Sequence, residues 1–280
     1  MKLHVVEGNT QKLDGGAMFG NAPKPLWQRW ITPDELNRIP MACRCLLMQT
    51  DDGQNILFET GIGNFFEPAL KDRYGVVEDE PCLLNNLNTL GLQHSDIDVV
   101  VLSHLHFDHA GGLLSGWEEG KTFELLFPNA RYLVGAKQWQ QANHPHYRDR
   151  ASFIPELNAL LKASNRLELV DQHNADAILP GVTFRFSDGH TPGLMLSEIT
   201  TDQGPLVFCS DLIPGRFWVH LPICMGYDRF PELLIDEKKA LLEYLLPKNG
   251  RLFFTHDDQV ACGKVMKDNR QRFYAEVISL

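Results

Sequence analysis

The sequence feature that most constrains the fold is an apolar run that ends in a cluster of metal-binding side chains. Residues 98–103 read DVVVLS, a β-branched run typical of a buried central strand. Residues 104–109 follow directly and read HLHFDH, with three histidines and one aspartate. Imidazole and carboxylate groups are common ligands of zinc and related metals. The fold must therefore deliver four polar side chains from the end of a buried strand to one place.

The spacing within this segment allows its side chains to serve two ions. His104 and His106 point the same way in an extended segment, because alternate residues share a face. Asp108 and His109 begin a new direction, and the two glycines that follow let the backbone turn closely around bound ions. The alternative is a histidine-rich loop without a metal, which would crowd polar groups together without partners. We therefore predict a metal site here.

Strand and helix signals alternate along the chain and predict a layered α/β architecture. Strands are expected at residues 44–49, 55–59, 98–103, 131–134, 182–186, 205–209 and 252–255, the first two joined by a hairpin turn at 51–53. Helices are expected at residues 81–90, 136–142, 155–161 and 231–246. Because the chain has no repeat or linker, we expect a single domain over residues 1–280, with an N-terminal arm at about residues 1–40.

Other polar residues also come directly after expected strands. His190 follows the strand at 182–186, Asp211 follows the strand at 205–209, and His256 follows the strand at 252–255. Side chains just past strand ends can converge at one rim of a sheet, and loops on such a scaffold commonly carry active sites. These three residues are therefore candidates to act with the segment at 104–109.

The segment at residues 104–109 resembles the HxHxDH signature of the metallo-β-lactamase superfamily. Further segments resemble motifs of that family in the same order: ETG at 59–61, GHTPG at 189–193, SD at 210–211 and the histidine at 256. The resemblance implies a four-layer αββα sandwich, an α/β fold, over most of the chain. It also implies two divalent ions, with zinc the default and iron, manganese or cobalt accepted by the same ligands.

The resemblance implies a role for each of seven ligands. They are His104, His106 and His190 for one ion, Asp108, His109 and His256 for the other, and Asp211 as a bridge. Asp108 is also the expected catalytic residue, which orients the nucleophile and carries its proton to the leaving group. Glu59 stands where the family usually has an aspartate that orients a ligand, and we expect the longer carboxylate to do the same.

The resemblance further implies a hydrolase in which a hydroxide bound to two metal ions opens a lactone, such as an acyl-homoserine lactone, or cleaves a related ester. The aspartate at position 211 resembles the bridging aspartate of lactonases, glyoxalase II-type thioesterases and phosphotriesterases. The segment at 14–27 looks like the opening of a lactonase and methyl-parathion-hydrolase-like branch. Pro214 stands where some lactonases carry a tyrosine, and Tyr227 is a candidate replacement.

Several alternatives remain open at this point. A phosphotriesterase or a glyoxalase II-like thioesterase would use the same ions, and a nuclease or a metal-binding scaffold without turnover could share the core. The formal net charge of −10 disfavours nucleic acid as a partner and leaves a neutral small molecule as the expected substrate. No apolar run is long enough to span a membrane, so we expect a cytoplasmic protein; a homodimer is compatible with the sequence.

Aromatic residues near these motifs are the candidates for substrate binding. They are Phe19, Trp27, Phe217, Trp218, His220 and Tyr227. For the two residues in the N-terminal arm, ordinary packing of the arm is the alternative. The six cysteines show no disulfide or zinc spacing and are expected to be reduced.

Overall fold

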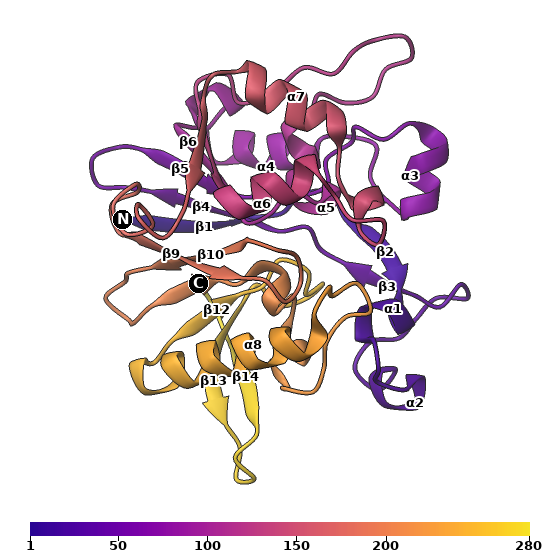
Figure 1. The fold of residues 1–280 in the computed structure, drawn as a ribbon, viewed down its shortest axis with the longest axis vertical. Helices are drawn as coiled ribbons and strands as arrows, with labels where there is room; N and C mark the ends of the chain where they lie inside the picture. The colour runs from indigo at the N-terminus through magenta and orange to yellow at the C-terminus, as the bar shows by residue number, and fades with distance from the viewer. The chain divides into compact units, whose positions relative to one another are not determined.

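The computed structural model describes residues 1–280, which divide into two compact units. The first unit comprises residues 1–11 and 42–171, and the second comprises residues 12–41 and 172–280. Each unit is built on its own six-stranded sheet (Figure 1). The α/β class expected from the sequence is confirmed, while the single domain over residues 1–280 stays a prediction.

The sheet of the first unit has the strand order β1-β4-β5-β6-β7-β8. Its strands are β1 (Lys2–Val6), β4 (Cys45–Gln49), β5 (Asn55–Phe58), β6 (Val99–Leu102), β7 (Arg131–Gly135) and β8 (Leu167–Val170). The strands β1, β4 and β5 pair antiparallel, whereas β5 to β8 run parallel. All four residues of β6 are buried, as expected for a parallel strand covered on both faces.

Helices accompany this sheet, and two of them bury a stripe of leucines. They are α3 (Pro68–Tyr74), α4 (Cys82–Thr89), α5 (Phe107–Ala110), α6 (Ala136–Asn143) and α7 (Pro155–Ala163). Leu83 and Leu87 of α4 are four residues apart, as are Leu157 and Leu161 of α7. Residues at that spacing share one helix face, and all four pack in the same core as Val100 of β6.

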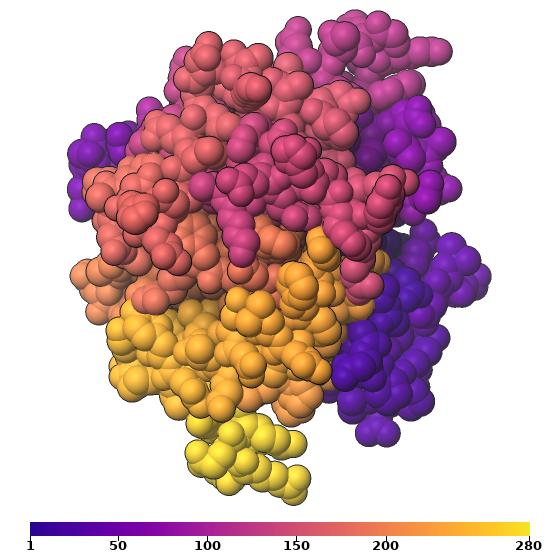
Figure 2. Space-filling model, viewed as in Figure 1, coloured from indigo at the N-terminus to yellow at the C-terminus, as the bar shows by residue number.

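The sheet of the second unit has the strand order β14-β13-β12-β11-β10-β9. Its strands are β9 (Val182–Ser187), β10 (Leu194–Ile199), β11 (Leu206–Phe208), β12 (Arg251–Phe253), β13 (Cys262–Lys267) and β14 (Phe273–Ile278). Only β11 and β12 pair in parallel. Figure 2 shows the hairpin of β13 and β14, coloured yellow, projecting beyond the orange atoms of this unit.

Helix α8 (Pro231–Leu245) packs on this second sheet, with Leu234, Leu241, Leu242 and Leu245 in its core. The N-terminal segment adds a two-stranded sheet and two short helices: β2 (Gln11–Asp14), β3 (Arg38–Met41), α1 (Gly15–Phe19) and α2 (Lys24–Trp27). None of the helices is both long and apolar enough to cross a membrane. The cytoplasmic location stays a prediction.

Three aromatic rings form the centre of the second unit's core. The ring of Phe19 stacks on that of Trp27, with centroids 5.5 Å apart, and on that of Trp218, with centroids 4.5 Å apart. Each of the three side chains is at most 1% exposed. The indole nitrogen of Trp218 donates a hydrogen bond of 2.9 Å to the carbonyl of Met18, so its polar atom is satisfied in the interior.

Every strand and helix expected from the sequence is present, with ends that differ by one or two residues. The strands β1, β2, β3, β8, β10, β13 and β14 were not expected. Most of these strands lack a dense β-branched run, so no local pattern predicts them. They form because their backbone pairs with a neighbouring strand. The six cysteines are free, and five of them are buried.

Replacing Trp27 by alanine tests whether the stacked rings stabilise the second unit. Removing a fully buried tryptophan leaves a cavity, so we expect the free energy of unfolding to fall by about 3–5 kcal/mol in urea titrations. Trp117 is 37% exposed and provides a matched control, for which a loss of less than about 1 kcal/mol is expected. Equal losses in the two variants would contradict this account.

Candidate metal centre

The first unit places its ligand candidates at the end of β6. His104 follows Ser103 directly after the strand, and His106 precedes the short helix α5, which contains Asp108 and His109. The change from extended to helical backbone separates the two pairs, as the spacing predicted. The three imidazoles lie together, with ring centroids 4.4 Å apart for His104 and His106 and 4.0 Å apart for His104 and His109.

Glu59 orients two members of this cluster. Because β5 and β6 are parallel, with Phe58 opposite Val101, the residues that follow the two strands meet at one edge of the sheet. The Oε2 atom of Glu59 lies 2.8 Å from Nδ1 of His109, and its Oε1 accepts a hydrogen bond from the hydroxyl of Ser103. The Ser103 hydroxyl in turn lies 2.9 Å from Nδ1 of His104.

The contacts of Glu59 suit a residue that orients ligands. The possible ligand atoms of Glu59, His104 and His109 all lie within 4.8 Å of one another, so proximity alone allows either role. Both oxygens of Glu59 already contact other side chains, and the one on His109 is at the ring nitrogen opposite to Nε2. Glu59 also has a φ of 63°, a conformation that non-glycine residues adopt mainly where the surroundings require it.

Asp108 has a partner that the sequence did not indicate. The side-chain amide of Gln11, which is fully buried, donates a hydrogen bond of 2.9 Å to Oδ2 of Asp108. The other oxygen of Asp108 lies 3.7 Å from Nε2 of His109. The Gln11 amide thus fixes the orientation of the carboxylate. No motif includes Gln11, and its distance of 97 residues from Asp108 left no signal in the sequence.

In the second unit, two ligand candidates, His190 and His256, both contact the carboxylate of the third, Asp211. Asp211 and His256 each come three residues after the ends of the parallel strands β11 and β12, whose last residues are paired. The Oδ2 atom of Asp211 lies 3.1 Å from Nε2 of His190, and its Oδ1 lies 3.2 Å from Nε2 of His256. Each oxygen therefore faces one imidazole, which suits a carboxylate that bridges two ions.

Asp228 holds His190 in this orientation. Its Oδ1 lies 2.8 Å from Nδ1 of His190, and its Oδ2 accepts a hydrogen bond of 2.7 Å from the amide of Met225. Burial raises the pKa of Asp228, and the contact with His190 acts in the opposite direction. A hydrogen on Nδ1 leaves Nε2 as the metal-binding nitrogen, which is the usual arrangement of a ligating histidine. The sequence analysis did not predict this role for Asp228.

The donor set in each unit fits divalent metal ions. Tetrahedral zinc with bonds of about 2.1 Å places neighbouring donor atoms about 3.4 Å apart. The separations of 3.1 and 3.2 Å around Asp211 are close to that value. Two acceptor atoms that face each other at such distances repel unless a proton or a cation lies with them. The donor atoms of these residues therefore fit a divalent metal ion.

The aromatic candidates for substrate binding fall into two groups. Phe19, Trp27 and Trp218 form the buried stack, so packing accounts for their positions. Phe217 is only partly buried and stacks on Trp30, with centroids 5.5 Å apart.

Two further candidates keep contact with solvent. Tyr227 is 44% exposed. Burial lowers the pKa of His220, and the nearby cations Arg272 and Lys238 lower it further. Substrate contact by any of the six candidates stays a prediction.

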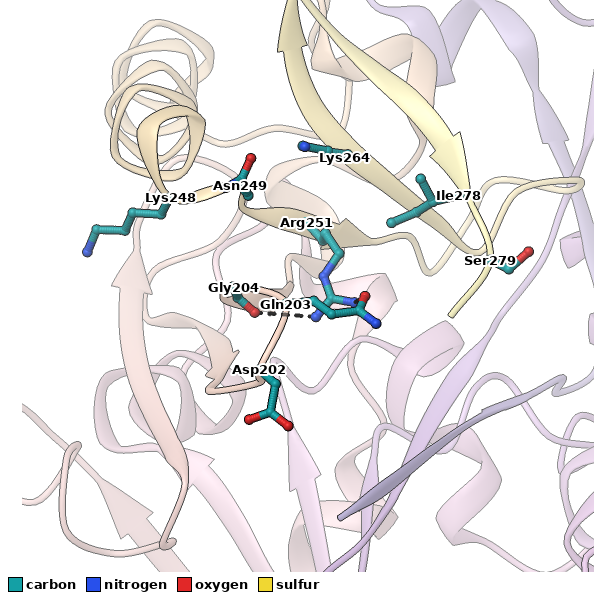
Figure 3. A pocket seen from close by; sticks show the side chains of 9 residues that line it. All are labelled: Asp202, Gln203, Gly204, Lys248, Asn249, Arg251, Lys264, Ile278 and Ser279. Carbon is teal, nitrogen blue, oxygen red and sulfur yellow. Dashed lines mark hydrogen bonds between the residues drawn. The ribbon is translucent and has the colours of Figure 1, made fainter.

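A separate pocket of about 600 Å³ lies in the second unit and is lined by Lys248, Arg251 and Lys264 among others (Figure 3). The Arg251 guanidinium donates to the side chain of Gln203 and to the carbonyl of Gly204. These contacts hold the turn that joins β10 and β11. The pocket contains no histidine, so its side chains do not suit a zinc-type ion.

The comparison with protein families identifies the class of this protein. The family model of the metallo-beta-lactamase superfamily matches residues 38–256, which include all seven ligand candidates. The chain therefore belongs to the metallo-beta-lactamase superfamily and is a hydrolase of that superfamily. The match confirms the resemblance and the fold type expected from the sequence.

Three relatives illustrate the similarity. N-acyl homoserine lactonase AiiA of Bacillus thuringiensis subsp. kurstaki is 26% identical over 242 residues, covering 81% of this chain and 85% of that protein. The crystal structure of a probable metal-dependent hydrolase from Staphylococcus aureus has a TM-score of 0.87 at 28% identity, covering 100% and 97% of the two chains. The structure of the dizinc quorum-quenching lactonase AidC has a TM-score of 0.77 at 22% identity, covering 99% of this chain and 94% of that chain. At this identity the similarity shows a shared fold and nothing more.

Glu59 variants test the orienting role of this carboxylate. Because Glu59→Gln weakens the hold on His109, we expect zinc affinity to fall about 10–100-fold, as measured by competition with a chromogenic chelator. Glu59→Asp keeps the charge and restores the residue usual in the family, so it should retain more affinity than Glu59→Gln. Glu118→Gln, at an exposed position, serves as the control. Wild-type affinity in Glu59→Gln would show that Glu59 does not orient the site.

Proposed function

We propose that the protein is a dinuclear metal-dependent hydrolase that opens lactones or cleaves related esters. One observation supports this proposal most strongly. In each unit, the Nδ1 atom of a ligand candidate lies 2.8 Å from a buried carboxylate: Glu59 holds His109, and Asp228 holds His190. Orientation of histidine by an outer carboxylate is a hallmark of metal sites and has little use in a plain packing histidine.

The proposed ligand set follows the family pattern. It consists of His104, His106 and His190 for one ion, Asp108, His109 and His256 for the other, and Asp211 as the bridge. The contacts of Asp211 with His190 and His256 support its bridging role. We propose zinc as the metal, because imidazole and carboxylate ligands in this proportion are typical of zinc hydrolases.

The reaction adds water to a carbonyl carbon and breaks the bond between that carbon and the ring oxygen. Two divalent ions, when bound, would lower the pKa of water towards ~7 and polarise the carbonyl. Asp108 would accept the proton of the attacking water and deliver it to the leaving oxygen. Its hydrogen bond from Gln11 keeps the carboxylate at a fixed position during both transfers. The product is a hydroxy acid.

The choice of a lactone rests on the relatives and on charge. The N-acyl homoserine lactonase AiiA and this chain align over most of both sequences. A neutral lactone suffers no repulsion from a chain with a formal net charge of −10, whereas an anionic substrate would. Phosphotriesters and thioesters are the alternatives on the same ions, and a substrate panel separates them.

Metal removal combined with a substrate panel tests the proposed function. We expect hydrolysis of N-hexanoyl homoserine lactone to exceed that of paraoxon and S-lactoylglutathione, and to disappear after chelation and return with zinc. Elemental analysis should give two metal ions per chain. Asp108→Asn should lower kcat by a factor of about 100 or more while the chain stays folded. Full activity after chelation would exclude the mechanism, and faster paraoxon or thioester cleavage would change the substrate class.

Phe217→Ala tests whether the exposed end of the aromatic cluster contacts the acyl chain. Its side chain is partly open, so truncation should preserve the buried stack while removing apolar contact. If Phe217 lines the acyl site, KM should rise more for a decanoyl than for a butanoyl lactone, by about 10-fold in ratio. Phe230→Ala, at a side chain 45% exposed, is the control. Equal changes in KM for the two lactones would place Phe217 outside the acyl site.

A further inference from the structure

Helix α8 carries a buried lysine that the proposed reaction does not use. Lys238 is 0% exposed, although lysine is almost never fully buried without a charged partner. Its Nζ donates hydrogen bonds to the backbone carbonyls of Trp218 at 2.9 Å, Ile223 at 2.6 Å and His220 at 3.4 Å. The ammonium group has three N–H donors, and the three carbonyls match that number.

The three carbonyls belong to the segment at 218–223, which leads directly to Asp228. The amide of Met225 donates to Oδ2 of Asp228, and Oδ1 of the same carboxylate lies on Nδ1 of His190. The backbone amide of Arg229 also donates to the carbonyl of His190. The segment that Lys238 holds therefore ends at the groups that hold His190.

Glu237, the neighbouring residue on α8, holds the segment that precedes His190 in the chain. Glu237 accepts hydrogen bonds from the hydroxyl of Ser187 at 2.6 Å, from the amide of Asp188 at 2.9 Å and from the amide of Gly189 at 3.0 Å. A Cβ atom placed on Gly189 would lie 2.4 Å from Cα of Leu234, so the backbone before His190 touches the helix itself.

We propose that α8 is the platform that positions His190, with Lys238 fixing the segment at 218–228 and Glu237 fixing the segment at 187–189. Lys238 and Glu237 are thus positioning residues, since neither contacts the proposed ions. The inference rests on the proposed function for the role of His190 as a metal ligand. Burying an ammonium group costs desolvation free energy. Positioning a metal ligand is a function that would explain why the lysine is kept at this site.

The charge of Lys238 gives the platform a dependence on pH. Burial lowers the pKa of Lys238 to about 8 from the ordinary 10.5, against the opposing effects of Asp228 and Cys224. His220 also faces the ammonium, and the pKa of His220 is lowered in part by Lys238. Opening of the segment at 218–228 would expose the amine to water and raise its proton affinity. Opening should therefore become less favourable as the pH rises from 8 towards 10.5.

Lys238→Met tests the platform, with Lys239→Met as the matched control on the exposed side of the same helix. Loss of the three hydrogen bonds should speed amide hydrogen exchange at 216–228 by about 10-fold or more, measured by mass spectrometry, because buried carbonyls lose their donors. Exchange at 103–112, in the first unit, should stay unchanged. Zinc affinity should fall about 10-fold, as for other residues that orient ligands from outside.

Glu237→Gln should weaken zinc in the same way while exchange rises at 187–190 and not at 216–228. Wild-type exchange and zinc affinity in Lys238→Met would overturn the proposal. If that variant does not fold, Glu237→Gln decides: wild-type exchange at 187–190 together with wild-type zinc affinity would overturn the proposal. In the wild-type protein, protection at 216–228, relative to 82–89, should increase between pH 8 and pH 10, and a constant ratio would contradict the pH dependence. Wild-type protein that binds no zinc would refute the proposed function alone, and the exchange measurements would still judge the platform.

Discussion

The proposed metal chemistry depends on one constraint, the fixed orientation of imidazole rings by buried carboxylates. A histidine offers two nitrogens, and a partner on Nδ1 decides that Nε2 faces the ion. Glu59 provides that partner for His109, and Asp228 provides it for His190. Because both carboxylates are buried, their contacts are electrostatically strong and difficult to rearrange. The folded protein thus fixes the orientation of both imidazole rings.

The parallel strand pairs explain how each unit achieves this arrangement. Side chains that follow paired parallel strands leave the sheet at the same edge, so Glu59 meets His104 and His109, and Asp211 meets His256. The backbone turns tightly after these strands. Glu59, which contacts His109, has a φ of 63°, and Ser210, which precedes Asp211, has a φ of 42°. Strain of this kind is maintained by surrounding structure and is common at functional sites.

The second unit adds support from a helix that carries no ligand. Glu237 and Lys238 are consecutive residues of α8, yet they reach segments 187–189 and 218–223, which lie more than 25 residues apart in the chain. A rigid helix can hold two such loops at once because its own hydrogen bonds fix the spacing of its side chains. In the proposed site, the position of His190 is therefore set in part by residues outside the ligand set.

The sequence by itself determined the class of the protein and selected seven candidates for its metal ligands. The buried run at 98–103, the spacing in HLHFDH and the polar residues after later strands were local features, and the family match and the strand ends agree with them. Only the tertiary structure decided which groups hold those candidates in place. Gln11, Asp228 and Lys238 are 97, 38 and 15 or more residues from their partners. Side chains of ordinary type, brought together by packing over such distances, leave no local pattern for the sequence to reveal.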